Sequence, residues 1–314
     1  MTFKFVDEKC AKPFLKWAGG KKQVIDFIDK KLPIEIKTSG VIDTYVEPFL
    51  GGGAVFFYLF DKFKINNVYL SDINKDLMLT FNVVKNNPKK LILELEMFAD
   101  KFLQSSPEIR KEYYYNVRED FNECLEHFDY DNFSDEHIIR ASQMIFLNKT
   151  CFNGLYRVNK SGKFNVPIGK YKNPLICDKK NLLIVSDVLK NVNINCCDYS
   201  KSEDFIDENS FVYLDPPYLP IKKTSFTNYH SQGFGVKEQI ELSQFCKKIN
   251  DKGAKFILSN SDPKNIDPSC NFFEETYGNL KLNKFGHHSI QVKRSINSKG
   301  NKRGPINELL IYNY

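Results

Sequence analysis

The sequence lacks the features of membrane, secreted and metal-binding proteins. It contains no apolar run approaching the roughly 20 residues needed to cross a bilayer, and residues 1–8 lack the apolar region of a signal peptide. Its eight cysteines show no CxxC spacing, and only Cys196 and Cys197 are adjacent. We therefore expect a cytoplasmic chain with no membrane partner, no bound metal and no disulfides, whose thiols are reduced and mostly buried.

Acidic side chains are missing from two segments, residues 147–174 and 281–303, of a chain whose net charge is +6. The basic residues of these segments are Lys149, Arg157, Lys160, Lys163, Lys170 and Lys172, and then Lys281, Lys284, Lys293, Arg294, Lys299, Lys302 and Arg303. Their positive charges outnumber the net charge of the whole chain, so the remaining residues together carry a net negative charge. This pattern is typical of a protein that binds a polyanion. Lysines that only solvate loops are the alternative, but the Asn, Ser and Gly residues in both segments favour nucleic acid.

The front of the chain has the pattern of a cofactor-binding half of an α/β fold. Thr44–Phe49 is typical of a buried strand, Gly51–Gly53 of a tight turn and Ala54–Phe60 of a helix. A second strand is predicted at Val68–Leu70, before Ser71 and Asp72.

We predict an α/β fold with a Rossmann-like, doubly wound mixed sheet. Residues 1–85 and 178–314 form the predicted catalytic domain, which closes with an apolar strand at Glu308–Tyr312. The insertion at residues 86–177 is predicted to hold helices first, with helical patterns at Leu91–Leu95 and Tyr113–Cys124, and a β-hairpin second. It is predicted to serve as the target-recognition domain.

A third small residue is missing from the glycine turn. Phe56 stands where a dinucleotide fingerprint would have glycine after Gly51 and Gly53, which argues against nicotinamide cofactors. S-adenosylmethionine is a nucleoside cofactor without a pyrophosphate. It therefore needs only the close approach of the backbone at Gly51 and Gly53, without the full glycine pattern. Asp72, about 20 residues beyond the turn, suits a ribose hydroxyl, although an N-cap role is the alternative. Phe49 is either a cation–π partner for the sulfonium or a core residue.

Asp215-Pro216-Pro217-Tyr218 follows the apolar strand Phe211–Leu214 and is the most informative motif. A carboxylate and a carbonyl held by two prolines can each accept one N–H of an exocyclic amine, and the tyrosine can stack on an extruded base. This predicts methyl transfer to a nucleobase. A strand-ending turn with a surface tyrosine is the alternative.

The first basic segment contains the turn signals Asn153-Gly154 and Ser161-Gly162, which favour a small β-ribbon. A ribbon fits a major groove, where Arg157 is the best candidate for a bidentate guanine contact.

These motifs occur in the order seen in Dam-type adenine methyltransferases, which the chain resembles over nearly its whole length, excepting about residues 87–135. The shared motifs are Lys16-Trp17-Ala18-Gly19-Gly20-Lys21, Glu47-Pro48-Phe49-Leu50-Gly51-Gly52-Gly53, Ser71-Asp72-Ile73-Asn74, Phe146-Leu147-Asn148, Tyr156-Arg157, Phe164-Asn165-Val166-Pro167, Gly169-Lys170-Tyr171, Asp215-Pro216-Pro217-Tyr218, Phe226-Thr227-Asn228-Tyr229-His230, Ser259-Asn260, Arg294-Ser295-Ile296 and Glu308-Leu309-Leu310. The ordered set is specific, although each motif alone is weak.

The resemblance implies a class I fold dependent on S-adenosylmethionine and a set of site residues. The cofactor contacts that the resemblance implies are Trp17, Lys21, Asp72 and Asp215, of which Asp215 also holds the target amine. The residues themselves add Phe49, Gly51 and Gly53, together with Glu47 of the same motif. Asp198 follows the apolar run Val192–Cys197 and is expected to receive the adenine of the cofactor. Asn153, Leu155, Arg157 and Pro167 match residues that contact bases of GATC, with Lys16 close by. Lys170 stands where the family often has arginine. The lysine offers a point charge in place of the forked contact that an arginine would make. Lys293 and Arg294 begin a stretch to Arg303 that we expect to bind phosphates.

The sequence thus predicts an adenine-N6 methyltransferase that acts on double-stranded DNA, at GATC, by base flipping and direct transfer. A cognate restriction endonuclease is a possible partner. One alternative is an RNA or protein-glutamine amine methyltransferase, but the first residue of the motif there is usually Asn and the ribbon would be unexplained. The other alternative is a noncatalytic DNA-binding module, which would not need the glycine turn paired with Asp72.

Overall fold

The computed structural model describes residues 10–17, 24–218, 234–265, 267–280, 282, 284–293 and 305–314. The chain divides into two compact units. Within the described residues, the first unit comprises residues 10–17, 51–57 and 74–196, and the second comprises residues 24–50, 58–73 and those from 197 onward. The division into a catalytic and a target-recognition domain stays a prediction.

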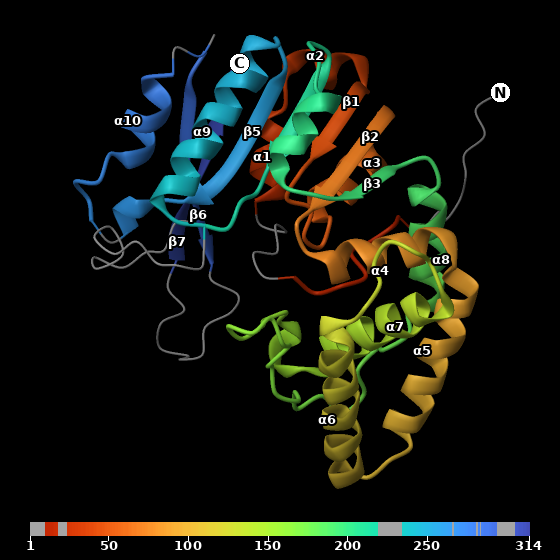
Figure 1. Ribbon diagram of the computed structural model, residues 1–314. Helices are drawn as coiled ribbons and strands as arrows, with labels where there is room; N and C mark the ends of the chain where they lie inside the picture. The colour runs from red at the N-terminus through yellow and green to blue at the C-terminus, as the bar shows by residue number, and fades with distance from the viewer. Residues whose placement is uncertain are drawn as a thin grey trace, which may run out of the picture. The chain divides into compact units, whose positions relative to one another are not determined.

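Seven strands form one mixed sheet in the order β3-β2-β1-β4-β5-β7-β6 (Figure 1). They are β1 (Val41–Glu47), β2 (Lys64–Asp72), β3 (Asn193–Cys196), β4 (Ser210–Leu214), β5 (Lys255–Ser261), β6 (Gly286–Lys293) and β7 (Pro305–Tyr312). Strands β2, β1, β4 and β5 are parallel, whereas β7 runs antiparallel to β5 and β6. The predicted doubly wound α/β fold is confirmed.

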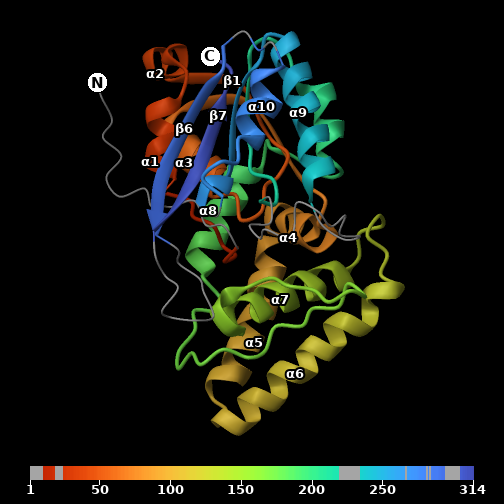
Figure 2. The same cartoon turned by 90° about the vertical axis from the view of Figure 1, so that its left-hand side faces the viewer.

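The helices of the structure are α1 (Ile25–Lys31), α2 (Ile34–Ser39), α3 (Ala54–Lys62), α4 (Lys75–Asn86), α5 (Pro88–Leu103), α6 (Pro107–Glu123), α7 (Asp135–Thr150), α8 (Lys179–Leu189), α9 (Val236–Asp251) and α10 (Phe272–Gly278). Short 3-10 turns include η3 (Phe152–Gly154) and η4 (Tyr199–Phe205). In the second unit, α1 and α2 lie on one face of the sheet, and α9 and α10 lie on the other (Figure 2). No helix within the described ranges is long and apolar enough to cross a membrane.

Apolar runs explain the central strands of the second unit. Every residue of β4 is buried, as expected for a parallel strand covered by helices on both faces. Its side chains Val212 and Leu214 pack with Phe245 of α9 and with Phe256 and Leu258 of β5. This core holds the carboxyl end of β4 in a fixed place.

Helices build the first unit, where α4 and α7 lie side by side (Figure 1). Asn74 caps α4, because its side chain accepts the Leu77 N–H at 3.0 Å. Phe146 of α7 is fully buried at the centre of an aromatic cluster, with Phe98 and Tyr113 at ring-centroid distances of 5.1 and 5.6 Å. The helical patterns predicted for residues 91–95 and 113–124 lie in α5 and α6, the second ending one residue before Cys124.

The predicted ribbon is less regular than a hairpin ladder. Its antiparallel pairing consists of two isolated bridges, Cys151–Ile168 and Val158–Phe164. The Ser161-Gly162 turn is present, with Gly162 at φ +77° donating to the Asn159 carbonyl. Asn153-Gly154 belongs to η3, where both residues have positive φ.

The expectation of mostly buried thiols is wrong. All eight cysteines are free, and of these only Cys151 and Cys246 are buried, whereas Cys10, Cys124 and Cys196 are exposed. Cys196 lies in β3, whose residues are exposed or half-buried, so the apolar run around it does not place it in the core.

Candidate functional site

Acidic residues occupy the carboxyl ends of three adjacent parallel strands in the second unit. Glu47 ends β1, Asp72 ends β2 and Asp215 follows β4. Because β1 lies between β2 and β4 in parallel register, these ends meet at one edge of the sheet. From β1 the chain goes to β2 on one side, and β4 lies on the other, so this edge is a topological switch point where α/β folds bind ligands.

Buried tyrosines surround these acids. Glu47 is 2% exposed and accepts the Tyr45 hydroxyl at 2.7 Å. Burial, and then the charge of Glu47, raises the pKa of Tyr45, to which Asp215 also contributes. Burial and the charge of Asp215 raise the pKa of Tyr213 in the same way. The carboxylates therefore place negative potential beside neutral phenols, an environment that favours a cationic ligand.

The Asp-Pro-Pro-Tyr segment is fixed from two directions. The Tyr218 hydroxyl donates to Glu308 of β7 at 2.9 Å. The Gln239 side chain of α9 donates to the Pro217 carbonyl at 3.1 Å and accepts from Asn260 of β5 at 3.1 Å. Both amide residues are fully buried.

Sequence reasoning missed the roles of Gln239 and Glu308. A glutamine in an amphipathic helix carries no motif. Glu308 belongs in the sequence to an apolar strand and a short motif that assign it no partner, and its alignment with Tyr218 across 90 residues depends on the β5–β7 register.

Three aromatic rings pack together close to β1 in the second unit. Phe49 is half-buried and lies 5.2 Å from the ring of Tyr199 and 5.9 Å from that of Phe234. The structure therefore places Phe49 in an aromatic cluster that is part of the packing around the core. A cation–π role beside that packing role stays a prediction.

The structure separates two proposed roles for Asp72. It is half-buried, and the N-cap of α4 is Asn74 rather than Asp72, which removes the capping alternative. Its backbone carbonyl accepts the Cys197 N–H at 3.2 Å, which brings Asp198 to the neighbourhood of β2. The Asp198 carboxylate is exposed and caps η4 by accepting the Ser200 N–H at 3.0 Å. A structural role therefore accounts for Asp198, and its cofactor role stays a prediction.

In the first unit, Trp17 covers the glycine turn. A Cβ added at Gly51 would lie 2.8 Å from the Trp17 ring, and one at Gly52 would lie 3.2 Å from the Trp17 side chain. Gly51 and Gly53 have φ of +50° and +70°. Glycine is thus required at Gly51 both by backbone conformation and by the close approach of the indole.

Lys16 and the Asn153-Gly154 turn also come together in the first unit. The buried Asn148 carboxamide accepts the Lys16 N–H at 2.8 Å and donates to the Lys16 and Gly154 carbonyls at 2.8 and 3.1 Å. A Cβ at Gly154 would lie 2.3 Å from Lys16 Cδ. The Lys16 ammonium lies 4.5 Å from the centre of the Tyr171 ring.

The residues predicted to read bases are on the surface of the first unit. Asn153, Arg157, Pro167 and Lys170 are exposed, and Leu155 is half-buried. The Arg157 Nε donates to the Asn165 side chain at 2.7 Å, and an Nη donates to the Asn165 carbonyl at 3.3 Å. The guanidinium is therefore oriented by its own segment.

Three predicted site residues are not described as side chains. Lys21 and Arg294 lie outside the described residues, and only the backbone of Lys293 is described, at the end of β6. The motif Phe226–His230 also lies outside. Within the described residues, no group of three or more His, Cys, Asp or Glu side chains has the arrangement of a metal site.

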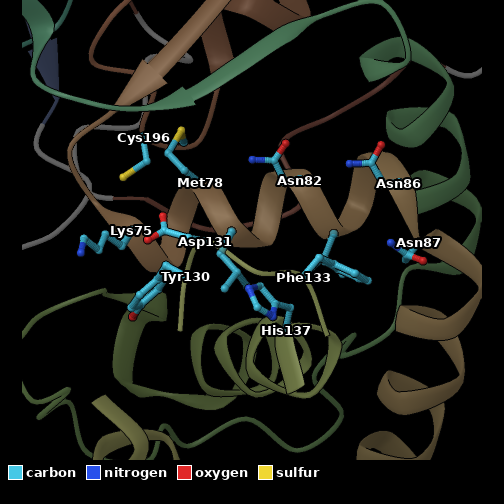
Figure 3. A pocket seen from close by; sticks show the side chains of 12 residues that line it. Lys75, Met78, Asn82, Asn86, Asn87, Tyr130, Asp131, Phe133, His137 and Cys196 are labelled. Carbon is cyan, nitrogen blue, oxygen red and sulfur yellow. The ribbon is translucent and has the colours of Figure 1, made fainter. Parts of the chain in front are cut away.

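A cavity of about 520 Å³ lies in the first unit along α4 (Figure 3). Lys75, Asn82 and Asn86 line it from α4, with Tyr130, Phe133 and His137 opposite. Its lining includes none of the site residues predicted from the sequence. It is therefore not the predicted cofactor or base-reading surface.

Comparisons with known proteins show the family of this chain. The sequence profile of the D12 class N6 adenine-specific DNA methyltransferases matches residues 17–296. The chain is 51% identical over 305 residues to the type II methyltransferase M.MjaIII of Methanocaldococcus jannaschii, covering 96% of this chain and 99% of that protein. It is 34% identical over 308 residues to the type II methyltransferase M1.LlaDCHI of Lactococcus lactis, covering 96% and 95%. It is 33% identical over 304 residues to the DNA adenine methylase of Escherichia coli, covering 95% and 93%.

Proposed function

Because the chain belongs to the D12 class N6 adenine-specific DNA methyltransferases, we propose that the carboxyl edge of β1, β2 and β4 is where it methylates adenine. The protein is an adenine-specific DNA methyltransferase, and S-adenosylmethionine is the methyl donor of this family. The site residues, the DNA sequence recognised and the base-flipping step are our proposals.

The residues present suit this cofactor. Asp72 ends β2 without serving as a helix cap, which suits a ribose diol. The acids Glu47 and Asp215 favour a cationic sulfonium, and Phe49 adds an aromatic face. Trp17, Gly51 and Gly53 supply an indole and a turn that admits close backbone approach. Lys21 and Asp198 are proposed as further contacts. When bound, the cofactor supplies an electrophilic methyl group.

Asp215 is proposed to orient the target amine. Its carboxylate and the Pro216 carbonyl each accept one N–H of an adenine extruded from the duplex, which directs the nitrogen lone pair and stabilises the positive charge that develops there. Tyr218 is proposed to stack on the base. Transfer is direct, so the chain forms no covalent intermediate, and the product ammonium is acidic enough to lose its proton to solvent.

The observation that carries this proposal is the rigid support of the motif at the switch point. The hydrogen bond from Gln239 fixes the Pro217 peptide, and the bond from Tyr218 to Glu308 fixes the end of the segment. Catalysis by positioning needs such support, because small misplacements of the acceptors cost large factors in rate.

Replacing Asp215 with alanine tests the assignment. We expect methyl transfer to duplex DNA to fall about 10²–10³-fold, the cost of removing one group that stabilises developing charge. Asp204→Ala, which removes an exposed carboxylate of η4, is the matched control and should retain wild-type turnover. Turnover by Asp215→Ala within tenfold of wild type, with the fold intact, would refute the role.

We further propose that the segment around Arg157 reads GATC, with Asn153, Leu155 and Pro167 as additional base contacts and Lys16 close by. Exposure of Arg157 and its orientation by Asn165 support this proposal. Lys170, Lys293 and Arg294 are proposed to contact DNA as charges. Methylation-aware sequencing of DNA from a host that expresses the chain tests the site, and modification of adenine in another sequence would refute it.

Arg157→Ala should relax site choice by about 1–3 kcal/mol per lost base contact, whereas Lys160→Ala should weaken binding equally at all sequences. An unchanged site preference in Arg157→Ala would remove it from the reading set.

The domain roles and cellular setting are also proposals. Residues 1–85 and 178–314 are proposed to catalyse, and residues 86–177 to recognise the target. We propose a cytoplasmic enzyme acting on chromosomal or plasmid duplex DNA. A cognate endonuclease is proposed because two relatives are named type II methyltransferases. Protection of host DNA from an endonuclease that cuts at the methylated site would support this setting, and full cleavage of that DNA would contradict it.

A further inference from the structure

Tyr156 touches two functional elements of the first unit. Its ring stacks on Trp17 with a centroid distance of 5.2 Å and an interplanar angle of 18°. Its hydroxyl lies 3.5 Å from Asp76 Oδ2 and is hydrogen-bonded by Asn74. The next residue along the chain is Arg157. A single half-buried side chain thus contacts the proposed cofactor wall and directly precedes the proposed base-reading arginine.

Asp76 is a fixed anchor for that hydroxyl. Arg140 holds it with two hydrogen bonds, from Nε at 2.6 Å and from Nη2 at 3.1 Å, and Tyr130 adds a third at 2.8 Å. Asp76 and Arg140 are 5% and 2% exposed. The Arg140 guanidinium also lies 4.2 Å from the centre of the Phe121 ring. With its charge paired and enclosed, the carboxylate keeps one orientation.

Trp17 is also constrained by the glycine turn. Its indole lies against Gly51 and its Cβ against Gly52, where an added Cβ would approach these Trp17 atoms to 2.8 and 3.2 Å. A displacement of the indole must therefore be accommodated by the glycine turn or by Tyr156. Packed side chains of this kind transmit small shifts because they have no free volume in which to absorb them.

We propose that Tyr156 is a positioning residue that couples cofactor binding to target reading. This inference rests on the proposed roles of Trp17 and Arg157. When the cofactor lies against Trp17, the indole is pressed onto the Tyr156 ring. Because Asp76 holds the Tyr156 hydroxyl, the ring passes this displacement on to the backbone of the next residue, Arg157. By linkage, cognate DNA bound at Arg157 raises cofactor affinity by the same factor that cofactor raises DNA affinity.

The coupling factor is measured directly in the full-length protein. The dissociation constant of a GATC duplex is determined with and without saturating S-adenosylhomocysteine, which cannot react. We expect at least fivefold tighter binding with the cofactor product in wild type. Tyr156→Leu should reduce this factor to below about twofold, while its binding to either ligand alone stays within about threefold of wild type. Tyr156→Phe keeps the stacked ring and should retain an intermediate factor.

Tyr113→Leu is the matched control, because Tyr113 is another half-buried tyrosine of the first unit, packed on Phe98 and Phe146. It should leave the coupling factor unchanged. Loss of coupling in this control as well would mean general loosening and would overturn the inference. Absence of coupling in wild type, or an unchanged factor in Tyr156→Leu, would also overturn it.

Trp17→Ala and Arg157→Ala separate this inference from the proposed sites. If Trp17→Ala binds S-adenosylhomocysteine normally, the proposed cofactor contact of Trp17 is wrong, whatever Tyr156 does. If Arg157→Ala keeps full site preference, the proposed base contact of Arg157 is wrong in the same way. If both variants lose their ligand and coupling nevertheless survives in Tyr156→Leu, only the coupling role fails.

Discussion

The buried ion pair between Asp76 and Arg140 gives a sharp stability prediction. Asp76→Asn keeps the shape of the side chain and removes its charge, which leaves the Arg140 guanidinium uncompensated at 2% exposure. Removing one partner of a buried pair costs about 3–5 kcal/mol. This loss is a large fraction of the roughly 5–15 kcal/mol that stabilises a typical protein. For a unit of this size we expect the melting temperature to fall by about 6–20 °C.

The fluorescence of Trp17 provides the assay. The chain has one tryptophan, and it belongs to the first unit together with the ion pair. Urea titrations followed by this fluorescence therefore report unfolding around Trp17 in that unit, while circular dichroism reports the whole chain. The predicted loss should appear in the fluorescence transition.

Two further variants decide the interpretation. Asp135→Asn breaks an ion pair between Asp135 and Lys90 of 2.8 Å whose side chains are 75% and 62% exposed, and should cost less than about 1 kcal/mol. The double variant Asp76→Leu/Arg140→Met replaces the buried pair with apolar groups and should recover much of the lost stability. A loss below about 1 kcal/mol in Asp76→Asn would refute the reasoning, because the guanidinium would then be stable without its partner.

Three other outcomes follow from the contacts described. Gly154→Ala should weaken DNA binding in titrations with a duplex, because the new methyl group must displace Lys16 and the positive φ adds roughly 1 kcal/mol of strain. Unchanged affinity would show that the close approach of Lys16 to Gly154 is unimportant for binding. The pKa of Tyr213 is raised in the folded state, so the contribution of the neutral phenol to stability is complete below the unfolded pKa of about 10 and is lost as the pH rises above that value. The urea midpoint should therefore fall above about pH 10, and it should fall less in Tyr213→Phe. Gln239→Leu should lower kcat more than it raises KM for DNA, because it releases the Pro217 carbonyl and not a substrate contact; a change in KM alone would contradict this.

The sequence was sufficient for the parts of the site that are encoded locally. Asp215 follows four apolar residues and precedes two prolines, so its place at the end of a buried strand was predictable from the residues themselves. The same holds for the glycine turn after β1, where the conformation of Gly51 requires glycine. The resemblance to a family then assigned roles to both.

Contacts between distant residues were not predictable in this way. Asp76 and Arg140 are 64 residues apart, and each alone is an ordinary charged residue of an amphipathic helix. Their pairing depends on how α4 packs against α7, which periodicity does not specify. The turns of the ribbon were predictable because turn signals are visible in the sequence, whereas the number of paired residues between the turns depends on tertiary contacts such as those of Asn122 with Phe164.

The position of β7 has a consequence for synthesis. It lies between β5 and β6, although it follows both along the chain. A nascent chain that has reached residue 293 therefore exposes the unpaired edge of β5, and β6 has no neighbour on which to form. Bare edges of this kind recruit foreign strands. Until the ribosome releases β7, such a chain is prone to aggregate, and it also lacks the carboxylate that restrains Tyr218.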